Sequence, residues 1–266
     1  MADPAIPSEW ADYMRQLDWP EHHERWHYEQ RYDWWRHRAA HHPQAPVRAA
    51  AQQMVAYGDS KNWTSGAHAE GAPGHGLHFL AMHRAMIALV AARFPQHAHL
   101  LAGWKTPPLD PKDPDNPVAG EVAFDANKAL GIQVVETGQA GFASEDEFAL
   151  FLETSIRPTA SDPTNLSTDP RTGLHNYLHN RWADGTSPLN LGDPRTNLFN
   201  ARFWRLHGWI DNLWTAYRKT HGLPDDEPAH VELLEQYRHM MEHGGHHHLA
   251  AKTSVRRPVI TSVFLE

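Results

Sequence analysis

The 266-residue chain contains no cysteine. Disulfide bonds, thiolate metal sites and cysteine nucleophiles are therefore excluded, and any bound metal ion would need His, Asp or Glu ligands. Long apolar runs are also missing, because no stretch approaches the roughly 18 uninterrupted apolar residues of a membrane-spanning helix. The first residues lack the basic-then-apolar pattern of a secretory signal, so we expect a cytoplasmic protein.

Positive charge is scarce as well. Lys and Arg number 24 against 32 Asp and Glu, which gives a formal net charge of -8. An acidic surface opposes nonspecific binding to nucleic acids and to anionic membranes. The charge therefore indicates neither a nucleic acid nor a membrane as the partner.

What the chain has in excess is histidine, with 22 residues, accompanied by 11 tryptophans. Apolar periodicity and turn residues predict a mainly α fold with few short strands. We expect a central four-helix bundle formed by residues 46–57, 77–94, 171–183 and 197–220. Further helices are expected within 8–42 and at 144–153 and 227–243, and strands at 121–124 and 132–136, with an extended or strand-like tail.

The order of these expected elements predicts that the chain is divided into three parts. These are an N-terminal helical arm at 1–45, a core at 46–220, and a C-terminal helix with a His-rich tail at 221–266 packed on the core. The histidine pairs at 22–23 and 41–42 are expected at the surface. The His/Met run at 240–248 is expected either to capture copper or to be solvated.

One histidine group lies in the segment LHNYLHNRWADGTSPLNLGDPRTNLFNARFWRLHGWIDNLW. His175 and His179 are four residues apart, which places both imidazoles on one face of a helix. A turn-forming SP…GDP segment lets the next helix, which carries His207, fold back on the first. The three imidazoles predict a metal site, although an HxxxH pair alone is usually incidental.

A second histidine group lies in HGLHFLAMHRAM, which contains His75, His78 and His83, with His68 in the loop before it. The apolar neighbours of His83 predict that it is buried. A buried histidine must satisfy two ring nitrogens, and one metal bond with one hydrogen bond would do so. Three imidazoles suit copper, and they also suit zinc with an open coordination position.

Together the two groups resemble the type-3 dicopper proteins, which include tyrosinases, catechol oxidases and o-aminophenol oxidases. HNYLH is similar to the family's HNxxH motif, and FLAMHR is similar to its FLPWHR motif. The family's closing signature is matched by Ser187-Pro188, Asp193-Pro194, Phe203-Trp204, His207, Asp211 and Trp214. The resemblance covers residues 68–214.

The resemblance implies two copper ions, each with three histidine ligands. One ion would be held by His175, His179 and His207, and the other by His68, His75 and His83. No histidine lies between residues 43 and 67, where the family's first ligand is usual, so His41 and His42 stay open as alternatives to His68.

The resemblance also implies roles for other residues. Asn176 stands where an asparagine helps to hold the water that deprotonates a monophenol. Asp169 is the nearest substitute for the family's acidic partner, which is missing from its usual place before His175. Asp211, one turn after His207, could orient the free N–H of that ligand.

The expected activity is the oxidation of o-diphenols or o-aminophenols by O2 to quinones or quinone imines, with ortho-hydroxylation of monophenols left open. Two alternatives are a non-catalytic type-3 protein that binds oxygen and copper, as hemocyanins do, and an altered site with a single metal ion. The count of bound metal ions and the presence of turnover distinguish the three.

Overall fold

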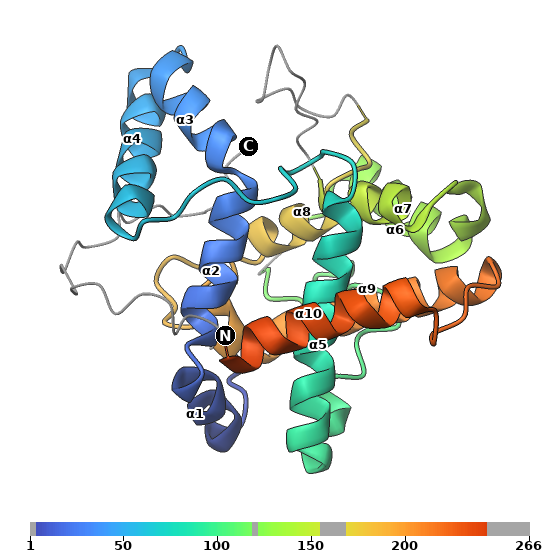
Figure 1. Ribbon diagram of the computed structural model, residues 1–266. Helices are drawn as coiled ribbons and strands as arrows, with labels where there is room; N and C mark the ends of the chain where they lie inside the picture. Colours follow the sequence, from blue (N-terminus) through green and yellow to red (C-terminus); the bar gives the residue numbers. More distant parts are fainter. Residues whose placement is uncertain (1–3, 119–121, 155–168, 244–266) are drawn as a thin grey trace.

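The computed structural model describes residues 4–118, 122–154 and 169–243, and its secondary structure is mainly helical, as expected (Figure 1). The only β pairing among these residues is an isolated bridge between Ala5 and Asn200. The helices are α1 (Ser8–Gln16), α2 (Trp19–Gln30), α3 (Tyr32–His41), α4 (Ala45–Ser60), α5 (His75–Arg93), α6 (Ala126–Thr137), α7 (Glu145–Glu153), α8 (Leu174–Arg181), α9 (Ala201–Thr220) and α10 (Pro228–His243), with short 3-10 turns η1 (Pro95–Leu100), η2 (Gln139–Gly141) and η3 (Asn197–Phe199).

The strand expected at 132–136 is wrong, because these residues form the second half of α6. The side chain of Asp125 caps this helix by accepting hydrogen bonds from the backbone N–H groups of Asn127 and Lys128. Such a cap stabilises a helix by about 1 kcal/mol, and Ile132 and Val135 are buried on one of its faces. Capping and burial thus outweigh the β propensity of the valines. Residues 122–124 form no strand either, and the predicted tail strand lies outside the described residues.

Three of the four helices expected at the centre do lie there, namely α5, α8 and α9. Helix α4 does not, because it packs on α3 around a separate apolar cluster that includes Met54 and Tyr57. Helix α2 takes its place: Trp19 and Trp26 belong to the main core, and α2 runs beside α5 (Figure 1). The central bundle is therefore α2, α5, α8 and α9.

The predicted burial of α5 is confirmed, since Phe79, Met82 and Met86 are 0% exposed. Helices α7 and α10 pack against it. The N-terminal residues contribute to the same core through Trp10, and the indole N–H of Trp19 donates to the carbonyl of Met241 in α10. Among the residues described, no helix combines the length and apolar character needed to span a membrane.

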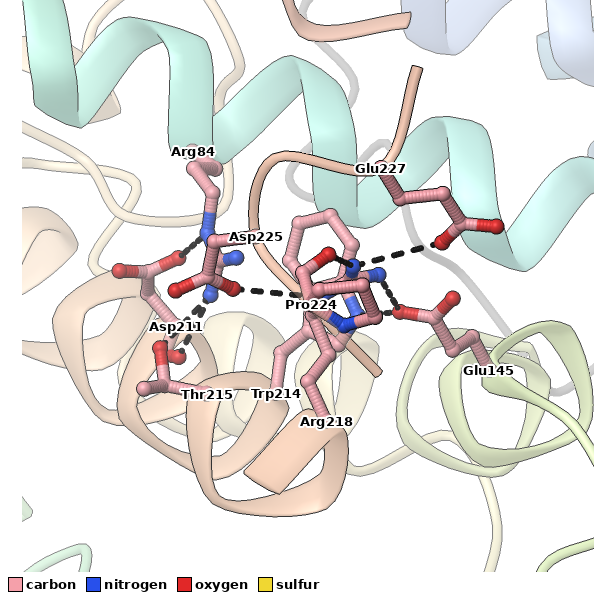
Figure 2. A network of polar contacts seen from close by, with 9 residues as sticks. All are labelled: Arg84, Glu145, Asp211, Trp214, Thr215, Arg218, Pro224, Asp225 and Glu227. Carbon is pink, nitrogen blue, oxygen red and sulfur yellow. Dashed lines mark hydrogen bonds and ion pairs between the residues drawn. The ribbon is translucent and has the colours of Figure 1, made fainter. Parts of the chain in front are cut away.

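A polar network joins α5 to α9 (Figure 2). Arg84 donates to the carboxylate of Asp211 at 2.5 Å and to the hydroxyl of Thr215 at 2.8 Å. Its guanidinium also lies 3.8 Å from the ring centre of Trp214, whose indole N–H donates to Glu145 of α7. Arg84 thus links α5 to α9 through an ion pair, a hydrogen bond and a cation–π contact, and removing one partner of this half-buried pair would leave the other unsatisfied.

Gly208 in α9 is a point where two backbones meet closely. A Cβ atom there would lie 2.4 Å from the carbonyl oxygen of Leu101 and 2.7 Å from the amide nitrogen of Gly103. Alanine normally stabilises a helix interior by about 1 kcal/mol relative to glycine. Here the contact is with backbone atoms that cannot rotate away, so overpacking outweighs that gain.

We predict that Gly208→Ala lowers the free energy of unfolding by about 1–3 kcal/mol, measured by urea denaturation. Gly141→Ala is the control, because a Cβ there meets no atom within 4 Å; its effect should stay within about 0.5 kcal/mol. A stabilised Gly208→Ala variant would contradict the close approach of these two segments.

Candidate metal centre

Six buried histidines from the four central helices converge at one place. Each is between 1% and 3% exposed. Among the described residues, two groups bring three ring nitrogens within 4.8 Å of one another, and His83 belongs to both. These groups could hold a metal ion. The six are His23 and His27 of α2, His83 of α5, His175 and His179 of α8, and His207 of α9.

The two halves of the centre have the same arrangement of histidines. Helices α2 and α8 each contribute a histidine pair with four-residue spacing, whereas α5 and α9 each contribute a single histidine. His83 donates its Nδ1–H to the carbonyl of Phe79 at 2.9 Å, and His207 does the same to Phe203 at 2.8 Å. The two single imidazoles stack with ring centres 4.2 Å apart. An FxxxH turn therefore sets the ring orientation in both halves.

Backbone carbonyls also orient one histidine of each pair. Nδ1 of His23 lies 2.7 Å from the carbonyl oxygen of Pro194, and Nδ1 of His179 lies 2.7 Å from that of Leu191. Because a carbonyl only accepts, Nδ1 must carry the proton and Nε2 must present its lone pair. This hydrogen bond to the second ring nitrogen is the usual support of a metal-ligating histidine.

The inward-facing Nε2 atoms lie close to one another. Nε2 of His83 is buried with no hydrogen bond. Nδ1 of His175 faces the side-chain oxygen of Asn176, so its Nε2 is unprotonated, yet it lies 3.1 Å from Nε2 of His207. Nε2 of His23 and His27 are likewise 3.2 Å apart. Two ligand nitrogens at about 2.0–2.1 Å from one metal ion would be about 3–3.4 Å apart, so the geometry fits a metal.

A proton cannot easily take the place of that metal. Burial lowers the pKa of His23 and of His179 to about 4. Burial, reinforced by the neighbouring imidazoles, also places the pKa values of the other four well below the ordinary value of 6.5. All six rings are therefore neutral at pH 7, which is the form that binds metals.

The sequence-predicted ligands separate into two sets. His83, His175 and His207 share one group, and the ring of His179 lies 4.5 Å from that of His175. Neither group includes His68 or His75, so the geometry does not support the ligand set expected for the first metal ion.

His75 has a different partner, the buried carboxylate of Glu153, at 2.8 Å. Although burial lowers the pKa of His75, that carboxylate raises it above its usual value. His68 is half-buried and stacks on His78 with ring centres 4.1 Å apart. Of the alternatives for the first ligand, His41 is exposed and His42 half-buried at the end of α3, and neither joins the groups.

His23 and His27 are the functional candidates that the sequence analysis missed. The expectation that the pair at 22–23 lies at the surface is wrong for His23, which is 1% exposed. The available signal was the HxxxH spacing, identical to that of His175 and His179. It was obscured because the segment PEHHERWH also reads as a charged surface run, although Glu24 within it is buried against the hydroxyl of Tyr57.

Two further expectations change. Asp211 does not orient His207, because it pairs with Arg84 while His207 donates to Phe203. Asp169, the expected acidic partner of Asn176, forms an ion pair with Arg171 at 2.8 Å. Asn176 itself is 4% exposed, and its amide donates to the backbone carbonyl of Glu153 at 2.6 Å, which turns its oxygen toward His175.

Comparison with known proteins returned no match from family models, from curated proteins or from solved structures. The metal centre is therefore argued from its own residues.

We predict that His23→Ala weakens metal binding by about 10-fold or more, whereas His68→Ala leaves it unchanged. The physical reason is that His23 presents an unprotonated nitrogen to the centre, and His68 does not. Isothermal titration of the metal-free variants with Cu2+ measures both. The reverse order of effects would restore the ligand set expected from the sequence.

Proposed function

We propose that the six histidines hold two copper ions and that the chain oxidises o-diphenols or o-aminophenols with O2, yielding quinones or quinone imines. The observation that carries the proposal is the pair of facing, unprotonated Nε2 atoms in a buried set of neutral imidazoles. Neither group includes a carboxylate, and imidazole ligands suit copper. The likeness of HNYLH and FLAMHR to the type-3 motifs favours copper over zinc.

The two halves of the centre supply the two ligand sets. His23, His27 and His83 would hold one ion, and His175, His179 and His207 the other. Because His83 also groups with His175 and His207, a single metal ion shared by those three is the second candidate. Copper content, at two ions or one per chain, separates these arrangements.

When bound, the copper pair would accept electrons from the substrate and pass them to O2. The chain's own contribution is orientation and exclusion of water. Asn176 is held by the carbonyl of Glu153, and its oxygen in turn holds the proton of His175 on Nδ1. The burial of all six imidazoles removes water from the ligands and strengthens their electrostatic interactions.

The same burial favours an alternative function, a protein that binds oxygen and copper without turnover. O2 needs only a narrow path, whereas a phenol must approach the metal. This alternative predicts two bound copper ions and reversible oxygen binding, with no quinone formed from any phenol.

Substrate class follows from the handling of the phenolic proton. A monophenol has a pKa of about 10 and stays protonated at pH 7, so its hydroxylation needs a base. Asp169, the nearest substitute for the acidic partner that helps to hold such a base, is engaged by Arg171. Oxidation of an o-diphenol or an o-aminophenol requires no oxygen insertion, and it is the easier reaction at this centre.

We predict that the copper-loaded protein oxidises catechol or 2-aminophenol about 100-fold faster than phenol, because a positioned general base contributes rate factors of about that size. Initial quinone formation in stopped-flow absorbance measures the ratio. His179→Ala, loaded in the same way, is the control for oxidation by free copper. Equal rates without a lag would show that Asn176 has another base.

A further inference from the structure

A line of four side chains leads from the metal centre to a half-buried edge of the molecule. It starts at Trp26 of α2, which is 6% exposed. The Trp26 ring centre lies 5.0 Å from that of His27 and 6.4 Å from that of His83. The indole therefore lies beside two histidines of one candidate metal-binding group. Nothing in the proposed phenol oxidation requires a tryptophan at this place.

The next member is Tyr237 of α10. The indole N–H of Trp26 donates to the phenol oxygen of Tyr237 at 3.4 Å, and that oxygen lies 2.8 Å from Nδ1 of His78. An indole N–H can only donate, so the phenol accepts from Trp26 and its own hydrogen is free to be donated to His78. Hydrogen bonds are thus donated in one direction, from Trp26 to Tyr237 and from Tyr237 to His78.

His78 is suited to receive that proton. Burial lowers its pKa to about 4, so the ring is neutral at pH 7 and has a free lone pair. Burial also raises the pKa of Tyr237 to about 12, so the phenol keeps its proton under the same conditions. His78 stacks on His68, and both are half-buried at the edge of the protein.

We propose that Trp26, Tyr237 and His78 form an electron path to the metal centre. Through it, Tyr237 would reduce the centre after hydrogen peroxide has over-oxidised it, and so protect the histidine ligands from oxidation. One electron leaves Tyr237 through Trp26 and reduces the centre. The phenol proton moves from its oxygen to Nδ1 of His78, which leaves a neutral tyrosyl radical and an imidazolium. An external one-electron reductant, such as ascorbate or a thiol, then restores the phenol as the proton returns.

This path rests on the proposed function for its oxidant, which is the copper centre exposed to hydrogen peroxide. The geometry around the tyrosine is independent of it. Tyr217 provides the matched comparison: it is equally buried, but its hydroxyl donates to the carbonyl of Phe142 at 3.4 Å. A carbonyl cannot take up the phenol proton, so Tyr217 has no partner for coupled oxidation.

The first arm of the test uses the copper-loaded protein, frozen shortly after addition of hydrogen peroxide, with electron paramagnetic resonance as the readout. A tyrosyl signal is expected in the wild type and in Tyr217→Phe, and it should be absent in Tyr237→Phe. His78→Gln should reduce it by about tenfold or more, because a positioned proton acceptor speeds such a step by at least that order. Bound copper and catechol turnover should not change in these variants.

The second arm oxidises the metal-free protein with a photogenerated ruthenium(III) polypyridyl complex and follows the phenoxyl absorbance. The long-lived signal should again depend on Tyr237 and His78 and not on Tyr217. A signal that persists in Tyr237→Phe, or that is unchanged in His78→Gln, overturns the proposal in either arm.

The two arms separate the two proposals. If copper fails to bind, the proposed function fails, and the metal-free arm still decides whether Tyr237 and His78 act as a coupled pair. If copper binds and catechol is oxidised but no tyrosyl signal forms, the electron path fails and the proposed function stands.

Discussion

The candidate metal centre depends on one contact, between unprotonated imidazole nitrogens that face one another inside the protein. Nε2 of His175 and Nε2 of His207 are 3.1 Å apart, and burial keeps both rings neutral. In an apolar interior, two lone pairs at that distance destabilise the fold unless a cation lies between them. A metal ion bound there would turn the same contact into a set of bonds, and its binding would then be coupled to folding.

The helices around the centre hold those nitrogens in place. The FxxxH turns of α5 and α9 fix two rings through carbonyls of their own helices, so that orientation depends only on local sequence. The network from Arg84 to Asp211 and Trp214 links α5 to α9, and at Gly208 the backbone of α9 lies against that of Leu101 and Gly103. Arg84 directly follows His83 in sequence and Gly208 directly follows His207, while Asp211 lies one helical turn after His207.

Much of this could be predicted from the sequence. The apolar periodicity of α5 and the HNYLH pattern of α8 depend on local residue order, and the structure has both helices in the core. The histidines of α2 could not be recognised in the same way. His23 and His27 stand among charged residues, and the partner of His23, the carbonyl of Pro194, lies 171 residues away in sequence. The neighbour of His75 was equally hidden in the sequence, since Glu153, whose carboxylate lies beside its Nε2, is 78 residues away.

The most direct test of the central claim is anomalous diffraction at the copper edge from crystals of the copper-loaded protein. The account predicts two peaks, one bonded to Nε2 atoms of His23, His27 and His83, the other to those of His175, His179 and His207. A single peak among His83, His175 and His207 would establish one metal ion. A peak ligated by His68 or His75 would contradict the geometry from which the centre is argued.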